Sequence, residues 1–159
     1  MARAHDGLVA TVGHIEALPG ATNVIPGSCL TSLDVRHSDD ASRGAAVTTL
    51  IDSAKAIAAR RGLDVQWDTR LDQPSTPMDP TLVATLERAV SRSGSSVHHM
   101  ASGAGHDAMI MAGRMPAAML FLRSPRGISH HPGETVIEDD VAAALAAGQQ
   151  FLEDVARSG

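Results

Sequence analysis

Two histidine-bearing loops flank one apolar run in the last third of the chain. The loop SGAGHDA carries His106, the loop GISHHPGE carries His130 and His131, and the run AAMLFL lies between them at residues 117–122. A neutral imidazole can move a proton, donate a hydrogen bond or bind a divalent metal such as zinc or manganese. Open α/β sheets build their sites beyond the carboxyl ends of their strands. The spacing therefore predicts half of an active site in this region.

The histidines do not form a sequence-local metal motif. The chain contains no HxH, HExxH or CxxC spacing, which are the usual local patterns of zinc ligands. His130 lies on a tight turn two residues before Pro132, so it is a candidate metal ligand. On local evidence alone, a loop histidine bonded to the backbone is the favoured alternative.

The first 72 residues predict a β-β-α-β block. Strands are expected over 8–17 and 28–36, close enough in sequence to pair antiparallel. A helix is expected over 39–61, because its apolar residues recur at helical spacing and Gly62 is a suitable C-cap. Alternating apolar residues predict a third strand over 65–71.

The remainder of the chain follows a proline-rich boundary, QPSTPMDP, and predicts an α-α-β-α block. The expected elements are a helix from Asp79 to Gly94, a short helix at 106–113, a strand at 117–122, and a last helix opened by a Thr135–Glu138 capping box. The last helix is expected to bury Val141, Leu145, Gly148, Leu152 and Val155. The strand has no polar alternation and should be buried on both faces. One such strand cannot make a sheet, so it needs neighbours that this chain does not supply.

Composition excludes several classes of function. The chain has 159 residues and a net charge of −5, and Lys55 is its only lysine. It has no basic stripe for nucleic acid and no apolar run long enough to span a membrane. Its first residues lack the apolar core of a secretory signal. The single cysteine, Cys29, cannot form an internal disulfide, so we expect a cytoplasmic protein.

Five segments carry a resemblance to a known family, in its order and spacing over nearly the full chain. They are TVGHIEALPGATNVIPG, LTSLDVRH, PMDP, SGAGHDAM and GISHHPGE. The chain resembles the C-terminal half of metal-dependent amidohydrolases of the aminoacylase/carboxypeptidase superfamily, in the branch of N-carbamoyl-L-amino-acid hydrolases and allantoate amidohydrolases. The resemblance implies an α/β fold. Residues 76–159 would be part of a zinc-peptidase-like catalytic domain, and residues 7–72 part of an inserted α+β, ferredoxin-like lid and dimerisation domain.

The resemblance also implies roles for both histidine loops. His130 matches the family's last metal ligand, whereas His131 lies where the family is variable and is expected not to bind metal. His106 matches the pocket histidine that polarises the scissile carbonyl or binds substrate, so it is the candidate catalytic residue. Gly105 is expected to let the substrate approach the backbone closely. Asp107 is expected to cap the short helix or, less readily, to orient His106.

Two residues of the first block match the family's substrate-binding residues. They are Asn23 and Arg36, which would hold the carboxylate end of the substrate. The planar guanidinium of Arg36 suits a carboxylate. The alternative is a surface salt bridge of Arg36 with Asp34. In this branch such residues resemble ones donated across a dimer, so a homodimer is expected.

The other metal ligands and the glutamate base of the family lie in its N-terminal half, which has no counterpart here. The chain has no Glu-Glu pair, and Asp39 in its one His-x-Asp is expected to be a helix N-cap. The implied activity is hydrolysis of carbon–nitrogen bonds other than peptide bonds in N-carbamoyl or ureido acids, with a dinuclear zinc or manganese centre. One ligand cannot hold that centre, so this chain alone is expected to be inactive. The alternatives are a non-catalytic fragment, a split-enzyme subunit that needs an N-terminal half chain, or an aminoacylase or peptidase of the same superfamily.

Overall fold

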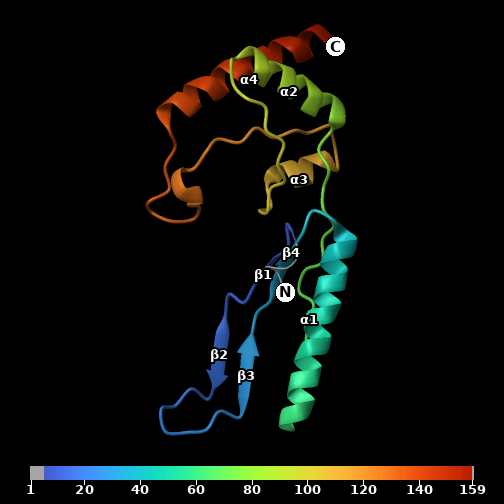
Figure 1. The fold of residues 1–159 in the computed structure, drawn as a ribbon, viewed down its shortest axis with the longest axis vertical. Helices are drawn as coiled ribbons and strands as arrows, with labels where there is room; N and C mark the ends of the chain where they lie inside the picture. The colour runs from blue at the N-terminus through green and yellow to red at the C-terminus, as the bar shows by residue number, and fades with distance from the viewer. Residues whose placement is uncertain (1–5, 159) are drawn as a thin grey trace. The chain divides into compact units, whose positions relative to one another are not determined.

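The computed structural model describes residues 6–158, and the chain divides into two compact units, Met1–Ser75 and Thr76–Gly159 (Figure 1). Together the described residues form a mixed α/β structure. The identification of these units as lid and catalytic domains stays a prediction. Two of the predictions fall partly outside the described residues. One is the end of the second predicted domain at Gly159, and the other is the start of the chain, where no secretory signal is expected.

Unit 1 contains two short antiparallel strand pairs. β1 (Val9–Thr11) pairs with β4 (Asp34–Arg36), and β2 (Ile15–Leu18) pairs with β3 (Ser28–Thr31). The predicted antiparallel pairing is therefore confirmed. Each predicted strand is nevertheless interrupted once, so the two-stranded ribbon is broken into two ladders.

Helix α1 (Asp40–Arg61) confirms the helix expected over 39–61. The side chain of Asp39 accepts a hydrogen bond from the backbone N–H of Ser42 at 2.7 Å, as an N-cap does. Gly62 ends the helix with φ of 65°, a left-handed conformation that glycine adopts without strain. Local capping chemistry fixed both ends of this helix.

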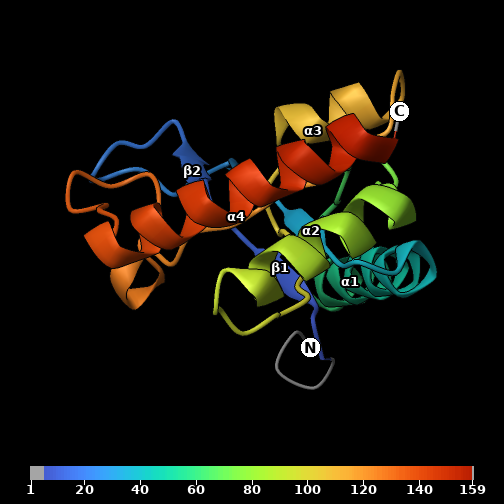
Figure 2. The same cartoon turned by 90° about the horizontal axis from the view of Figure 1, so that it is seen from above.

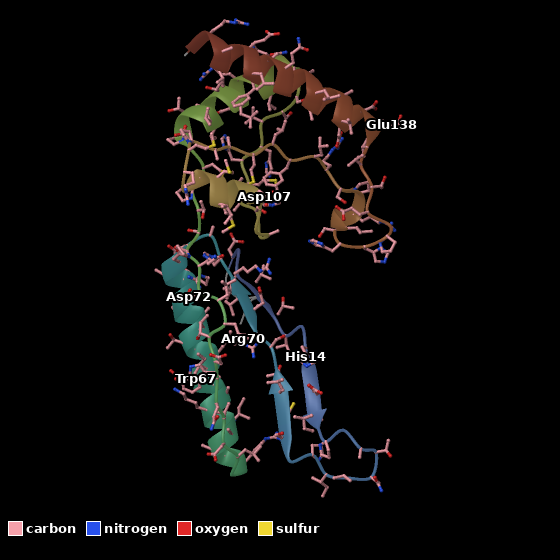
Figure 3. The ribbon with its side chains drawn as sticks, turned by 180° about the vertical axis from the view of Figure 1, so that it is seen from behind. His14, Trp67, Arg70, Asp72, Asp107 and Glu138 are labelled. Atoms are coloured by element: carbon pink, nitrogen blue, oxygen red, sulfur yellow. The ribbon has the colours of Figure 1, made fainter. Side chains whose placement is uncertain are left out.

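The third strand predicted over 65–71 is not formed. The segment after α1 runs back along that helix in an extended conformation (Figure 3). It is held by side chains: Lys55 Nζ lies 4.3 Å from the centroid of the Trp67 ring, and Arg43 Nη1 lies 2.7 Å from Asp72 Oδ1. The alternating pattern made the segment extended, but no strand of the described residues pairs with it.

Unit 2 is built on two packed helices, α2 (Pro80–Arg92) and α4 (Glu138–Ser158) (Figure 2). The N-cap of α2 is Asp79, as predicted, with its side chain accepting hydrogen bonds from the backbone N–H groups of Thr81 and Leu82. Between the two helices in sequence lie helix α3 (Asp107–Ala112) and the 3-10 turn η2 (Pro125–Gly127). Ala89 and Ala147 are the most buried residues of the unit, at 0% and 2% exposure.

Two predictions about α4 are wrong. The helix begins at Glu138, and the Thr135 hydroxyl lies 3.4 Å from the Val136 carbonyl oxygen, so the capping box does not form. The predicted core stripe is also misplaced, because α4 packs through the face of Ala147 and leaves Leu145 and Leu152 70% and 66% exposed. Val141 and Gly148 of the predicted stripe are half-buried, so the prediction fails mainly at the two leucines.

The buried strand predicted over 117–122 is also not formed. The segment is extended but has no strand partner in the part of the chain that the structure describes. Its first residue accepts a hydrogen bond from the Asp79 backbone N–H at 2.8 Å. Leu120, Phe121 and Leu122 are 42%, 38% and 40% exposed. A strand needs a neighbour for its backbone groups, and residues 6–158 supply none to this segment.

The solvent-accessible surface area of the chain is larger than expected for two well-packed units. Two separate compact units of this size would together expose roughly 9,000 Å². The chain exposes 12,275 Å². Many of the large apolar side chains in the described residues are accordingly exposed.

Candidate functional site

His106 lies immediately before α3, as its N-cap residue, and its ring is held by two contacts. Its Nε2 lies 2.7 Å from the Ser102 hydroxyl oxygen. Its ring also meets the Phe121 ring edge to face, with centroids 5.8 Å apart and planes at 64°. The side chain is nevertheless exposed, so the loop orients an imidazole that a ligand can reach.

The rest of the SGAGHDA loop leaves space beside this imidazole. Gly105 has an ordinary backbone conformation, and a Cβ added there would meet only the Met109 sulfur, at 3.7 Å. The chain's own packing therefore does not require glycine, which is compatible with a close approach by a ligand. Asp107 occupies the first turn of α3 rather than the N-cap position (Figure 3). No hydrogen bond joins its side chain to His106. Neither predicted role of Asp107 is seen.

The two histidines of the second loop have different surroundings. The ring Nδ1 of His131 accepts a hydrogen bond from the Gly133 backbone N–H at 2.9 Å, so this ring is part of the turn. His130 has φ of 55°, and its backbone N–H donates to Glu134 Oε2 at 2.8 Å. Its ring is exposed and makes no hydrogen bond within the described residues. Of the adjacent pair, His130 is the one whose ring nitrogens are available to a ligand.

The donor set of this chain does not fit a dinuclear metal centre. No group of three or more His, Cys, Asp or Glu side chains that could hold a metal ion occurs within residues 6–158. A zinc or manganese site needs several such donors. His130 can therefore serve at most as one ligand of a site completed elsewhere.

Arg36 ends β4 in unit 1 and forms the salt bridge that the sequence offered as its alternative role. Its Nε lies 2.6 Å from Asp34 Oδ1 and its Nη2 lies 3.0 Å from Asp34 Oδ2, so both carboxylate oxygens accept a hydrogen bond. The hydrogen bond from Arg36 lowers the pKa of Asp34 and raises the pKa of Arg36. Both side chains are about half exposed, at 51% and 52%. This geometry shows that the guanidinium can donate two parallel hydrogen bonds to a carboxylate.

The structure does not bring Asn23 and Arg36 together. Arg36 pairs with Val9 at one end of the broken ribbon, and Asn23 lies in the exposed loop beyond the Leu18–Ser28 pair at the other end. Ser28 and Arg36 are eight residues apart along β3 and β4, which at about 3.3 Å a residue separates these ends by roughly 26 Å. The two side chains of one chain therefore cannot hold the same small substrate.

A hollow of about 350 Å³ lies elsewhere in unit 2, between the start of α2 and the end of α3. Its lining includes Asp79, Met115 and Pro116, and none of the predicted site residues.

The described residues contain no helix that is long and apolar enough to cross a membrane.

Two contacts of the site were missed from the sequence. The Ser102 hydroxyl and the Phe121 ring set the orientation of His106, yet neither was predicted to do so. The Ser102 contact left a signal, because a hydroxyl four residues before a histidine in a glycine-rich loop can fold back onto the ring. The Phe121 contact left none, because it depends on how the run 117–122 lies against α3.

Comparison with known proteins covers most of the chain. Residues 4–154 match peptidase family M20/M25/M40. Allantoate amidohydrolase from Escherichia coli strain K12 is 38% identical over 143 residues, which is 90% of this chain and 35% of that protein. N-carbamoyl-L-amino-acid amidohydrolase from Pseudomonas sp. strain NS671 is 32% identical, over 84% of this chain and 32% of that protein.

A solved structure shows the same coverage. An amidase of the hydantoinase/carbamoylase family from Burkholderia multivorans superposes with a TM-score of 0.86 and 31% identity, over 94% of this chain and 37% of that one. The chain therefore spans about a third of the length of the relatives that it matches.

Proposed function

The chain belongs to peptidase family M20/M25/M40, and we propose that it is the C-terminal part of an amidohydrolase that cleaves carbon–nitrogen bonds other than peptide bonds. The substrates would be N-carbamoyl or ureido acids such as allantoate. The observation that carries the proposal is that both histidine loops fall inside a match to proteins named for this chemistry. Their exposed rings, His106 and His130, are the side chains with which it would act.

In this proposal His106 stabilises the charge that develops during hydrolysis. When water adds to the carbonyl carbon, the carbonyl oxygen becomes negative, and a positioned N–H donor lowers the energy of that state. The ring of His106 is exposed and held by Ser102 and Phe121, which is the preorganisation that such a donor needs. Gly105 beside it leaves room for the substrate.

His130 would contribute one ligand to a zinc or manganese centre. Its free ring and its left-handed backbone support this role, because strained conformations of non-glycine residues concentrate at functional sites. The remaining ligands and the general base would come from residues that this chain does not contain.

Arg36 and Asn23 would bind the carboxylate end of the substrate, one from each protomer of a homodimer. The roughly 26 Å between the two ends of the ribbon supports this division. Asp34 now occupies the Arg36 fork, so an incoming carboxylate would replace it with the same geometry.

We expect Arg36→Ala in the complete enzyme to lower kcat/KM for a carboxylate substrate by the equivalent of about 2–5 kcal/mol, mainly through KM. The matched control is Arg70→Ala, whose side chain is 89% exposed and pairs only with Asp68 among the described residues. Steady-state kinetics of both variants decide the point. An unchanged kcat/KM in Arg36→Ala would remove this residue from the site.

The partner of this chain would be a polypeptide that supplies the other two thirds of the relatives' length. The run 117–122 is extended, apolar and without a strand neighbour, and Leu145 and Leu152 of α4 are largely exposed. Such a run gains most from adding to a sheet, because pairing satisfies its backbone and buries its side chains. The exposed free thiol of Cys29 supports a reducing, cytoplasmic location.

The test is reconstitution. The chain is mixed with the N-terminal part of the Escherichia coli allantoate amidohydrolase. Ammonia release is measured from allantoate and an N-carbamoyl amino acid, and release of free amino acids is measured from a dipeptide. We expect no turnover by either polypeptide alone and turnover of a ureido or carbamoyl acid by the mixture. Turnover by this chain alone would refute the proposal, and preference for the dipeptide would favour the peptidase alternative.

A substitution in the run makes the reconstitution test specific. Leu120→Asp should prevent complementation, because a charge would be buried in the new sheet. The control, Leu63→Asp, changes a residue of unit 1 that is 62% exposed and should leave complementation intact. Equal complementation by both variants would show that the run is not the docking strand.

A further inference from the structure

Ser102 is placed to control the protonation pattern of His106. Its hydroxyl oxygen lies 2.7 Å from His106 Nε2, accepts a hydrogen bond from the Ala104 backbone N–H at 3.1 Å, and lies 3.1 Å from the Ala104 carbonyl oxygen. A hydroxyl has one proton to donate and two lone pairs to accept with. The serine proton can therefore go to the histidine or to the carbonyl, and that choice fixes the histidine tautomer.

The distances favour donation to the histidine. Hydrogen bonds from a hydroxyl have donor–acceptor distances of about 2.5–3.0 Å, and those from a backbone N–H extend to about 3.2 Å. The 2.7 Å contact with Nε2 fits a hydrogen bond in either direction. If Nε2 were the donor, the hydroxyl proton would have to go to the Ala104 carbonyl oxygen, and that 3.1 Å contact is long for a hydroxyl donor. The bond that the Ala104 N–H donates is within its range. Ser102 then donates to Nε2, and a neutral ring carries its proton on Nδ1.

We propose that Ser102 is a positioning residue that keeps neutral His106 in the Nδ1–H tautomer, so that the exposed side of the ring presents a hydrogen-bond donor. Nδ1 makes no hydrogen bond with the residues that the structure describes, so this donor is available to a ligand. The use of that donor on a substrate carbonyl rests on the function proposed above. Without Ser102 the ring would exchange between tautomers, and part of the population would present a lone pair to the carbonyl oxygen and repel it.

Phe121 completes the arrangement from the other side of the loop. Its edge-to-face contact restricts rotation of the imidazole, which would otherwise exchange the positions of the two nitrogens. Phe121 belongs to the run 117–122, which is proposed above to pair with a partner polypeptide. Its contact with His106 therefore links that run to the site. Pairing of that run with a partner strand would hold the ring more firmly.

The test is nitrogen NMR of the full chain with labelled histidine, at a pH where the rings are neutral. His106→Gln assigns the signals. We expect the wild-type ring to be protonated on Nδ1, Ser102→Thr to keep this pattern, and Ser102→Ala to shift the population toward the other tautomer. Ser96→Ala, which removes an exposed hydroxyl with no hydrogen bond in the described chain, should change nothing. A wild-type ring protonated on Nε2, or a Ser102→Ala spectrum identical to wild type, would overturn the proposal.

Kinetics of the reconstituted enzyme test the catalytic consequence separately. Ser102→Ala should lower kcat by about 10- to 100-fold with little change in KM, by analogy with the loss of hydrogen bonds that orient metal-binding histidines. Ser102→Thr should restore most of the rate. A tautomer change without a change in kcat would overturn the donor role. If no tested substrate is hydrolysed by the reconstituted wild type, the proposed function fails, and the nitrogen spectra still decide whether Ser102 positions His106.

Discussion

The two histidine loops of unit 2 are built in opposite ways. In the first, the chain fixes the ring of His106 through Ser102 and Phe121 and leaves the backbone ordinary. In the second, it fixes the backbone of His130, through a left-handed φ of 55° and the Glu134 carboxylate, and leaves the ring without a partner in the described residues. Under the proposed function, the first ring would contact the substrate. The second would bind a metal that other residues must help to hold.

The largest expected effect separates these two roles in the reconstituted enzyme. We expect His130→Ala to lose metal from one site and to lower kcat by more than about 100-fold. Replacing a residue that only supports a metal ligand already lowers metal affinity or activity by about 10- to 100-fold. We expect His106→Ala to keep its metal and to lower kcat by about 10²- to 10⁴-fold, as loss of a positioned proton donor does. Elemental analysis and steady-state kinetics check both.

The control for this pair is His131→Ala. Its ring already accepts a hydrogen bond from Gly133, so its removal should leave metal content unchanged. Full metal retention by His130→Ala, or metal loss by His131→Ala, would reverse the assignment within the adjacent pair.

A smaller effect is expected from Glu134, which holds the His130 backbone. Glu134→Ala removes the acceptor of the His130 N–H, so the loop loses its fixed conformation. We expect metal affinity to fall by about 10-fold and the His130 amide hydrogen to exchange faster, while the His106 loop is unaffected. Glu134→Gln keeps an acceptor oxygen and should recover most of the affinity.

The matched control is Glu138→Gln, which changes an exposed carboxylate at the start of α4. Equal loss of affinity in Glu134→Ala and Glu138→Gln would show that general charge near the loop, and not the Glu134 hydrogen bond, sets metal binding.

Sequence reasoning succeeded where neighbouring residues determine the structure. Asp39 and Gly62 delimit α1 by their own hydrogen-bonding and backbone preferences, and Asp79 does the same at the start of α2. The antiparallel pairing of the first two strands was also predictable, because the connecting loop is short. Family motifs identified the chain's relatives.

Sequence reasoning failed where structure depends on segments distant in sequence or outside the chain. The residues at 65–71 and 117–122 have strand patterns, but a strand forms only when another segment pairs with it. The prediction that Leu145 and Leu152 of α4 are buried was wrong, since the helix packs on α2 through the face of Ala147. The Phe121 contact with His106 could not be predicted, because it joins residues from separate segments.

The smallest expected effect concerns how the second loop is attached to the helical pair. Arg123, which precedes that loop, binds Asp140 of α4 through two hydrogen bonds of 2.7 and 2.5 Å. The bond from Arg123 lowers the pKa of Asp140 below its ordinary value of 3.8. The stabilisation is therefore complete above pH 3.8 and is lost as the pH falls through the lower, folded-state value.

Asp140→Asn should therefore loosen the His130 loop and leave the His106 loop unchanged. At neutral pH we expect faster amide exchange over residues 127–134 in the variant, no change over 102–108, and a melting temperature lower by no more than a few degrees. Because asparagine does not titrate, wild type and variant should converge as the pH is lowered and Asp140 takes up its proton. Asp139→Asn, beside it on the same helix, is the control. A difference that persists in acid would mean that packing, rather than the ion pair, anchors this loop. In that case the His130 loop would not be fixed through the Arg123–Asp140 pair, and it would differ less from the His106 loop.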